Sequence, residues 1–139
     1  LDDEAVTKFF IAQYVRTRES WLPAAAEENF RAVTILSEPG EQQRWGRFFS
    51  SNNASSPQVV WGKGAVVQAR VRNIAFINDR VANVRFTRTV QTDTDTQSSD
   101  WIATVTFRYT NAPMAEGDRY RNPLGFQVEN YRADPEVVR

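Results

Sequence analysis

Residues 81–109 read VANVRFTRTVQTDTDTQSSDWIATVTFRY, with apolar and polar side chains alternating on both sides of a polar turn at residues 92–99. A period of two places alternate side chains on opposite faces of a strand. The segment therefore predicts two long antiparallel strands joined by that turn. One face of the pair is apolar and must be covered by other elements, whereas the other face can meet water.

One further strand is expected on each side of this pair. Residues 65–71 alternate in the same way, and the apolar phase shifts after Asn73, which indicates a bulge or a sharp bend. A turn at residues 78–80 joins this strand to the next one. A last strand is expected at residues 125–132, before the Asp-Pro pair at 134–135 ends it. The sequence thus predicts an antiparallel sheet of about four strands.

The first fifty residues have helical periodicity instead. A first helix carries apolar side chains between residues 6 and 15, a second is expected to be capped by Ser20, and a third fits residues 41–50. The apolar surface of the first helix is broader than one core-facing stripe requires. Either the helix is buried on two sides of its own domain, or Ile11 and Tyr14, one turn apart, face a partner subunit.

Helices followed by strands predict an α+β domain in which N-terminal helices cover the apolar face of a curved antiparallel sheet. The chain has 139 residues, so residues 1–139 are expected to form a single domain. Cys and His are both absent. This excludes Ser–His–Asp triads, Cys–His pairs and the usual zinc sites, and the sequence gives no sign of a metal or a cofactor.

The charges of the chain are balanced, with 17 basic and 17 acidic residues and a formal net charge of zero. Binding to nucleic acid through its phosphates is therefore not expected. Four arginines nevertheless fall on the polar face of the predicted sheet: Arg70, Arg72, Arg85 and Arg108. This face is either a solvated exterior, where the arginine stems cover apolar surface, or a docking face for an acidic partner.

The last informative stretch is Asn122-Pro123-Leu124-Gly125, directly before the final strand. Asn-Pro followed by Gly predicts a rigid corner that is not helical. The corner either only turns the chain, or it presents Leu124 as an exposed contact point for a partner.

Four segments resemble the periplasmic domain of the VirB8 component of bacterial type IV secretion systems, an inner-membrane assembly factor. They are AVTKFFIAQYVRTRE at residues 5–19, AEENFRAVTILS at 26–37, SPQVVWG at 56–62 and NPLGFQVENYRADPE at 122–136. The last is the most specific, because Asn-Pro-x-Gly-Phe before a terminal Tyr-Arg-x-Asp-Pro strand is characteristic of the family. The resemblance covers essentially the whole chain.

The resemblance implies a fold similar to that of nuclear transport factor two and a non-enzymatic role without a cofactor. It implies a domain that forms homodimers and contacts other secretion subunits in the periplasm. A cytoplasmic tail and one helix in the inner membrane would precede Leu1. Ile11 and Tyr14 are the best matches to the family's dimer contact, with Glu116 as a further carry-over. The Asn122–Gly125 motif, which consists of Asn122, Pro123, Leu124 and Gly125, is associated with partner contacts and dimer stability.

A competing function comes from the same fold, which also hosts dehydratases and isomerases that work in the cone between sheet and helices. The side chains expected to face this cone are apolar: Val84, Phe86, Val105 and Phe107. They leave no evident acid–base pair, so we expect either a packed cone or a dry cleft that admits a small apolar ligand. A buried Asp–Tyr pair with a displaced carboxylate pKa would favour the enzyme. Binding to peptidoglycan or nucleic acid is a further alternative.

Overall fold

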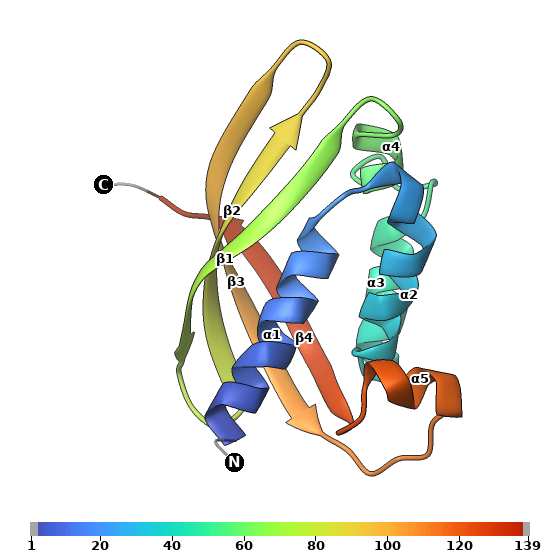
Figure 1. The fold of residues 1–139 in the computed structure, drawn as a ribbon, viewed down its shortest axis with the longest axis vertical. Helices are drawn as coiled ribbons and strands as arrows, with labels where there is room; N and C mark the ends of the chain where they lie inside the picture. Colours follow the sequence, from blue (N-terminus) through green and yellow to red (C-terminus); the bar gives the residue numbers. More distant parts are fainter. Residues whose placement is uncertain (1–2, 138–139) are drawn as a thin grey trace.

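A four-stranded antiparallel sheet curves around a long N-terminal helix in the computed structural model, which describes residues 3–137 (Figure 1). The strands follow the order of the chain across the sheet. In sequence the elements are α1 (Asp3–Glu19), a 3-10 turn η1 (Pro23–Ala25), α2 (Ala26–Ile35), α3 (Pro39–Phe49), α4 (Pro57–Val60), β1 (Val66–Phe76), β2 (Val81–Gln91), β3 (Thr96–Tyr109), α5 (Glu116–Arg121) and β4 (Phe126–Pro135). The predicted α+β class, with helices before a curved antiparallel sheet of four strands, is confirmed.

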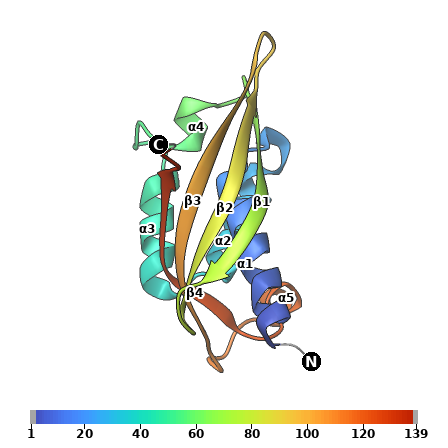
Figure 2. The ribbon, with the colours of Figure 1, turned by 90° about the vertical axis from the view of Figure 1, so that its left-hand side faces the viewer.

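The register of the sheet contains the bulge that the sequence predicted. The pairing of β1 with β2 shifts between Val71 and Asn73, where the apolar phase of β1 changes. A second shift, between Thr106 and Phe107, was not expected. The β2–β3 hairpin extends beyond the helices (Figure 2), and β3 begins before the predicted end of the turn. Polar cross-strand pairs such as Thr89 and Ser98, whose hydroxyls are 2.9 Å apart, accompany this extension.

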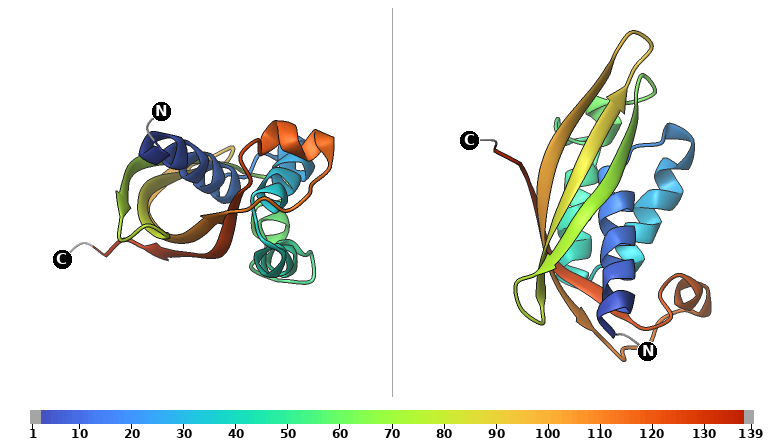
Figure 3. Two further views of the ribbon diagram at one scale, coloured as in Figure 1. Left: turned by 90° about the horizontal axis from the view of Figure 1, so that it is seen from below. Right: turned by 60° about the vertical axis from the view of Figure 1, so that its left-hand side comes forward.

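The core lies between α1 and the concave face of the sheet (Figure 3). Val84, Phe86 and Val105 are fully buried there and Phe107 is nearly so. These are the side chains expected to face the cone, and α1 fills the space in front of them. The interior is therefore a packed cone, one of the two arrangements that the sequence allowed.

The helices depart from the sequence prediction mainly at their ends. Ser20 does not cap the second helix, because its hydroxyl accepts a hydrogen bond of 3.1 Å from the amide of Ala69 on β1. The helix instead begins at Ala26, after the 3-10 turn. The third helix starts at Pro39, which suits a first helical turn because proline lacks an amide hydrogen. The short helices α4 and α5 were not predicted.

Candidate functional site

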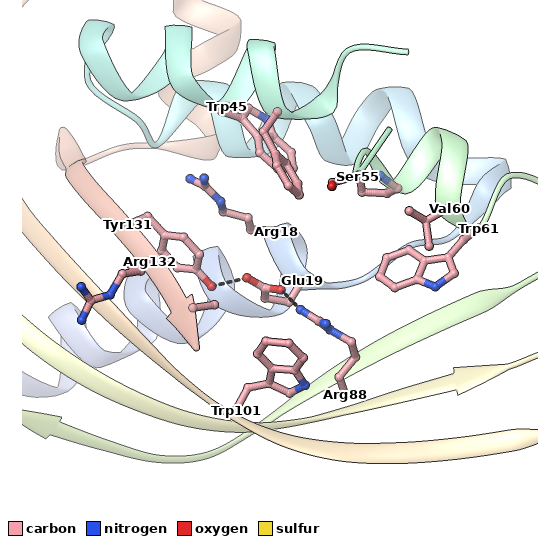
Figure 4. A pocket seen from close by; sticks show the side chains of 13 residues that line it. Arg18, Glu19, Trp45, Ser55, Val60, Trp61, Arg88, Trp101, Tyr131 and Arg132 are labelled. Carbon is pink, nitrogen blue, oxygen red and sulfur yellow. Dashed lines mark hydrogen bonds and ion pairs between the residues drawn. The ribbon is translucent and has the colours of Figure 1, made fainter. Parts of the chain in front are cut away.

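A cavity of about 370 Å³ lies between the C-terminal end of α1, helices α3 and α4, and strands β2 to β4 (Figure 4). Its walls combine tryptophans with charged groups. We call it the ion-paired pocket and define it by Arg18, Glu19, Trp45, Trp61, Arg88, Trp101 and Tyr131.

The Glu19 carboxylate joins two strands to the end of α1. One carboxylate oxygen accepts a hydrogen bond of 2.5 Å from Arg88 on β2, and the other accepts one of 2.6 Å from the Tyr131 hydroxyl on β4 (Figure 4). The Glu19 side chain is only 11% exposed. Its charge is thus taken up by a cation and a hydroxyl rather than by water, as a buried carboxylate requires.

The guanidinium of Arg88 lies between aromatic rings. Its carbon is 4.0 Å from the ring centre of Trp101 and 5.8 Å from that of Trp61. Contact with an aromatic face stabilises a cation. The Nε atom of Arg88 is buried and has no hydrogen-bond partner among the described residues, so this arginine keeps one donor unused beside the cavity.

Arg18 forms a second buried ion pair behind the first. It donates hydrogen bonds of 2.7 Å to the Glu41 carboxylate and to the Tyr14 hydroxyl, and its guanidinium stacks 4.2 Å from the Tyr131 ring centre. Glu41 is 1% exposed and accepts a further bond of 2.7 Å from Arg44. Both Glu41 oxygens are therefore paired, which offsets the cost of burying the charge.

The buried Tyr14 and the partly buried Tyr131 are held in their neutral form. Burial raises the pKa of Tyr131 well above its usual range, and the nearby Glu19 carboxylate raises it further. Burial also raises the pKa of Tyr14, although Arg18 acts in the opposite direction. Neither hydroxyl is suited to exchange protons with a substrate near neutral pH.

Glu19 and Tyr131 form a carboxylate–tyrosine pair, although the acid is Glu and not the Asp of the pair that would favour an enzyme of this fold. The pair lies outside the apolar cone, however, and Arg88 occupies the second carboxylate oxygen. With the raised tyrosine pKa, this arrangement favours a structural tie over an acid–base pair. The sequence analysis missed it because the two residues are 112 positions apart.

The two residues carried over as dimer contacts on the first helix are fully buried. Ile11 and Tyr14 are both 0% exposed and belong to the core between α1 and the sheet. The Tyr14 hydroxyl is also hydrogen bonded to Ser37, at 2.8 Å. The expectation that these two side chains themselves face a partner is therefore corrected, because they offer a second chain no surface. Burial of α1 within its own domain explains its broad apolar surface.

The surface that α1 does expose lies toward α5. A groove of about 350 Å³ runs between α1, α2 and the segment 120–123. Phe9 is 65% exposed and Tyr120 78% exposed at its sides. Together with the adjacent Pro123 and Leu124 we call them the α1–α5 surface. Glu116 opens α5 and is also exposed, and its carboxylate accepts a hydrogen bond of 3.2 Å from Tyr120.

The four residues of the predicted corner divide into two pairs. Asn122 is fully buried, accepts a hydrogen bond of 2.9 Å from the Phe126 amide and donates one of 2.8 Å to the Phe126 carbonyl. Gly125 has φ +73°, and a Cβ there would lie 2.1 Å from the Thr110 carbonyl oxygen. Pro123 and Leu124 are instead exposed. Asn122 and Gly125 therefore fix the shape of the corner, and Pro123 and Leu124 between them are exposed to solvent.

Three of the four arginines on the polar face of the sheet form ion pairs with carboxylates. Arg85 lies 3.2 Å from Glu136, and Arg72 lies 3.4 Å from the same carboxylate. Arg108 lies 3.5 Å from both Glu38 and Glu129. This pairing favours the solvated exterior over a docking face for an acidic partner.

No helix within residues 3–137 is both long enough and apolar enough to cross a membrane. No group of three or more acidic side chains in the described part of the chain is arranged to hold a metal ion.

Comparison with known proteins places these features in a family. The family model described as VirB8 protein matches residues 1–136. The type IV secretion system protein virB8 of Bartonella henselae is 40% identical over 137 residues, which cover 98% of this chain and 58% of that protein. The chain thus spans less than two thirds of the length of this curated relative.

Solved structures agree with the sequence comparison. The structure of Agrobacterium tumefaciens VirB8 is 28% identical and superposes with a TM-score of 0.93, covering 100% of this chain and 96% of that one. A TraE protein, solved in complex with 4-(1H-pyrrol-1-yl)pyridine-2-carboxylic acid, is 30% identical with a TM-score of 0.84, covering 98% and 99%. These likenesses confirm the expected fold, similar to that of nuclear transport factor two.

Proposed function

This chain belongs to the VirB8 family, and on that premise we propose that it is a non-enzymatic assembly component of a type IV secretion system. The match of the family model to residues 1–136 carries the proposal, together with a fold that agrees with a VirB8 structure over the whole chain. We place the domain in the periplasm, anchored by a helix in the inner membrane that lies outside this sequence. Its partners are other secretion subunits and a second copy of itself.

The contents of the cone support a role without catalysis. Val84, Phe86 and Val105 fill it with fully buried apolar side chains. Outside the cone, the Glu19 carboxylate that accepts a hydrogen bond from Tyr131 is also held by Arg88. A reaction in the cone would need a polar group that reaches a substrate, and these positions supply none.

We assign self-association to the α1–α5 surface. Phe9, Tyr120 and Leu124 are large hydrophobic or aromatic side chains that are each more than half exposed. Exposed apolar side chains gathered in this way are typical of protein contacts, and aromatic residues dominate their binding energy. Ile11 and Tyr14 then act from beneath, by fixing α1 against the sheet. Glu116 lies beside Tyr120 and supplies a polar contact at the rim.

The experiment is complementation in a strain deleted for the corresponding gene, using the full-length protein with its membrane anchor. Phe9→Arg places a charge on the α1–α5 surface and is expected to reduce conjugation or effector transfer by about tenfold or more while the domain keeps its melting temperature. Tyr131→Phe removes the hydroxyl an enzyme would use and should leave transfer nearly intact. Loss of transfer in Tyr131→Phe at a temperature at which the variant is still folded would overturn the assignment in favour of the enzyme.

A second candidate function is the binding of a small aromatic anion in the ion-paired pocket. The related TraE protein has been solved with pyridine-carboxylic acids. The pocket of this chain has flat tryptophan rings and the partly unsatisfied guanidinium of Arg88, which suit a flat ring with a carboxylate. Quenching of tryptophan fluorescence by 2-chloroisonicotinic acid measures this binding. Arg88→Met should abolish the quenching, and the matched variant Arg70→Met, on the outer face of the sheet, should not.

A further inference from the structure

A second cavity, of about 750 Å³, opens at the other end of α1, where the cone meets solvent. We call it the cone mouth. It is bounded by the first turns of α1, the turn between β1 and β2, and the end of β3, and Figure 3 shows this end of the sheet from below. Asp3 here and Glu19 at the ion-paired pocket lie on the order of 24 Å apart along the helix. The two cavities are therefore separate.

The floor of the cone mouth is aromatic. Phe107 is 5% exposed and packs against the rings of Phe76 and Phe126, with ring centres 6.1 and 5.8 Å away. The Tyr109 ring meets Phe126 edge to face, and its hydroxyl shares a hydrogen bond of 2.7 Å with Thr7. Because that polar group already has a partner, the floor offers a ligand mainly apolar surface. Its size is that of a typical small-molecule site.

The rim of the cone mouth carries acidic groups whose charge is only partly offset. Asp3 and Glu4 lie in the first turn of α1, where the helix dipole compensates them, and Glu4 also pairs with Lys8 at 3.5 Å. Asp79, in the turn between β1 and β2, has no cationic partner within salt-bridge distance among residues 3–137. Of the three carboxylates in the described lining, Asp79 is the one that lies outside a helix and has no ion pair.

The two arginines that line the cone mouth do not cancel this charge. Arg80 forms an ion pair with Glu129 on β4, and Arg108 lies 3.5 Å from Glu129 and from Glu38. Both guanidinium groups are therefore paired with carboxylates that do not line the cavity. The rim keeps an acidic excess.

We propose that the cone mouth binds an apolar organic cation, a small amine whose hydrocarbon body rests on the aromatic floor and whose ammonium group lies beside Asp79. The Phe76 ring already lies near a cation of the chain itself, because the Lys8 ammonium is 5.9 Å from the centre of the ring. An anion of the same shape would meet carboxylates at the rim and is rejected.

Three probes that share a phenethyl body test the proposal on the 139-residue chain: phenethylammonium, phenethyl alcohol and hydrocinnamate. Titration followed by amide chemical shifts gives the affinity and the place of binding together. Phenethylammonium is expected to bind most tightly and hydrocinnamate least, with shifts centred on Thr7, Phe76 and Tyr109. Equal affinities for the three probes, no saturation by the amine, or shifts centred on Trp61 and Trp101 would each overturn the proposal.

Two matched variants separate the charge from the fold. Asp79→Asn is expected to weaken phenethylammonium binding by about twofold to fivefold and to leave phenethyl alcohol unchanged, in keeping with the modest energy of exposed ion pairs. Asp93→Asn makes the same substitution in the β2–β3 turn, far from the cavity, and should change neither. Added salt should reduce the preference for the amine. If Asp79→Asn and Asp93→Asn behave alike, Asp79 does not recognise the ammonium group and the proposal fails.

Discussion

The ion-paired pocket and the α1–α5 surface both border α1, but they use opposite chemistry. At the pocket, charged side chains are buried and nearly every donor and acceptor is paired: Glu19 with Arg88 and Tyr131, and Arg18 with Glu41. At the α1–α5 surface, apolar side chains lie in solvent. A buried charge network loses stability when one member is removed, whereas an exposed apolar group costs the fold little. The side chains of the ion-paired pocket therefore hold the fold, whereas those of the α1–α5 surface are available for contact with a partner.

The corner at residues 122–125 also combines residues that hold the fold with residues that are exposed. Gly125→Ala tests this difference and has the largest expected effect on stability. The added Cβ would fall 2.1 Å from the Thr110 carbonyl oxygen at a φ of +73°, so the backbone must move. We expect a loss of about 3 kcal/mol or more in the free energy of unfolding, measured by urea denaturation.

Gly46→Ala is the matched control for the corner. Gly46 lies within α3, and a Cβ there would meet no atom within 4 Å. Because alanine favours a helix over glycine, this variant should gain up to about 1 kcal/mol. Equal effects of the two substitutions would contradict the view that Gly125 is held by the geometry of the corner.

The next effect in size concerns the buried network, in the variant Glu41→Gln. It leaves Arg18 charged and buried without its carboxylate, for which we expect a loss of about 3 kcal/mol in unfolding free energy. Glu136→Gln makes the same change on the sheet exterior, beside Arg72 and Arg85, and should cost less than about 1 kcal/mol. If Glu41→Gln loses as little unfolding free energy as Glu136→Gln, the pocket tolerates the loss of a carboxylate as well as the surface does. The contrast between the two regions would then disappear.

A smaller effect on the free energy of unfolding is expected at high pH, where Tyr131 and Tyr14 lose their protons. The pKa of Tyr131 is raised in the folded state, so the unfolded chain loses its proton first, near pH 10. The stability that this group contributes is therefore complete below that pH and is lost as the pH rises through the folded pKa, at a slope of at most about 1.4 kcal/mol per pH unit for one proton. Tyr14 adds to the slope in the same direction.

Tyr131→Phe measures how much the Tyr131 hydroxyl contributes to stability and to its pH dependence. At neutral pH it should cost about 1 kcal/mol, because one hydrogen bond to Glu19 is lost while Arg88 remains. Urea denaturation at pH 9 and at pH 10.5 should then show a shallower decline in the variant than in the parent chain. Parallel declines would mean that Tyr131 titrates equally in both states.

The sheet was predictable from sequence because its period of two runs over many residues. Even the bulge near Asn73 left a visible shift of phase. Helices α4 and α5 have four and six residues, too few for a periodic pattern, and were missed. In the corner, the exposure of Leu124 was foreseen, whereas the burial of Asn122 depends on hydrogen bonds to the backbone of the following strand.

The ion-paired pocket could not be predicted because its members are distant in the chain. Glu19 meets Arg88 over 69 positions and Tyr131 over 112, and each alone reads as an ordinary surface charge or strand residue. Ile11 and Tyr14 show a second limit of what periodicity can predict. Periodicity places them on one side of a helix, but it does not say whether that side meets the protein's own sheet or a partner.

The smallest effect on stability is expected for Leu124→Ser. This variant is also the sharpest test of the α1–α5 surface. Leu124 is 51% exposed, so the change should alter the unfolding free energy by no more than about 0.5 kcal/mol. If the α1–α5 surface joins two copies, the same variant should weaken the dimer measured by analytical ultracentrifugation by about tenfold, the effect of losing about 1.4 kcal/mol of contact. Val59→Ser is the control, because Val59 is also 51% exposed but lies on α4. The two side chains are equally exposed, so a tenfold loss of association in Leu124→Ser with no loss in Val59→Ser, at equal stability, would point to the place of the apolar side chain on the molecule rather than to its exposure.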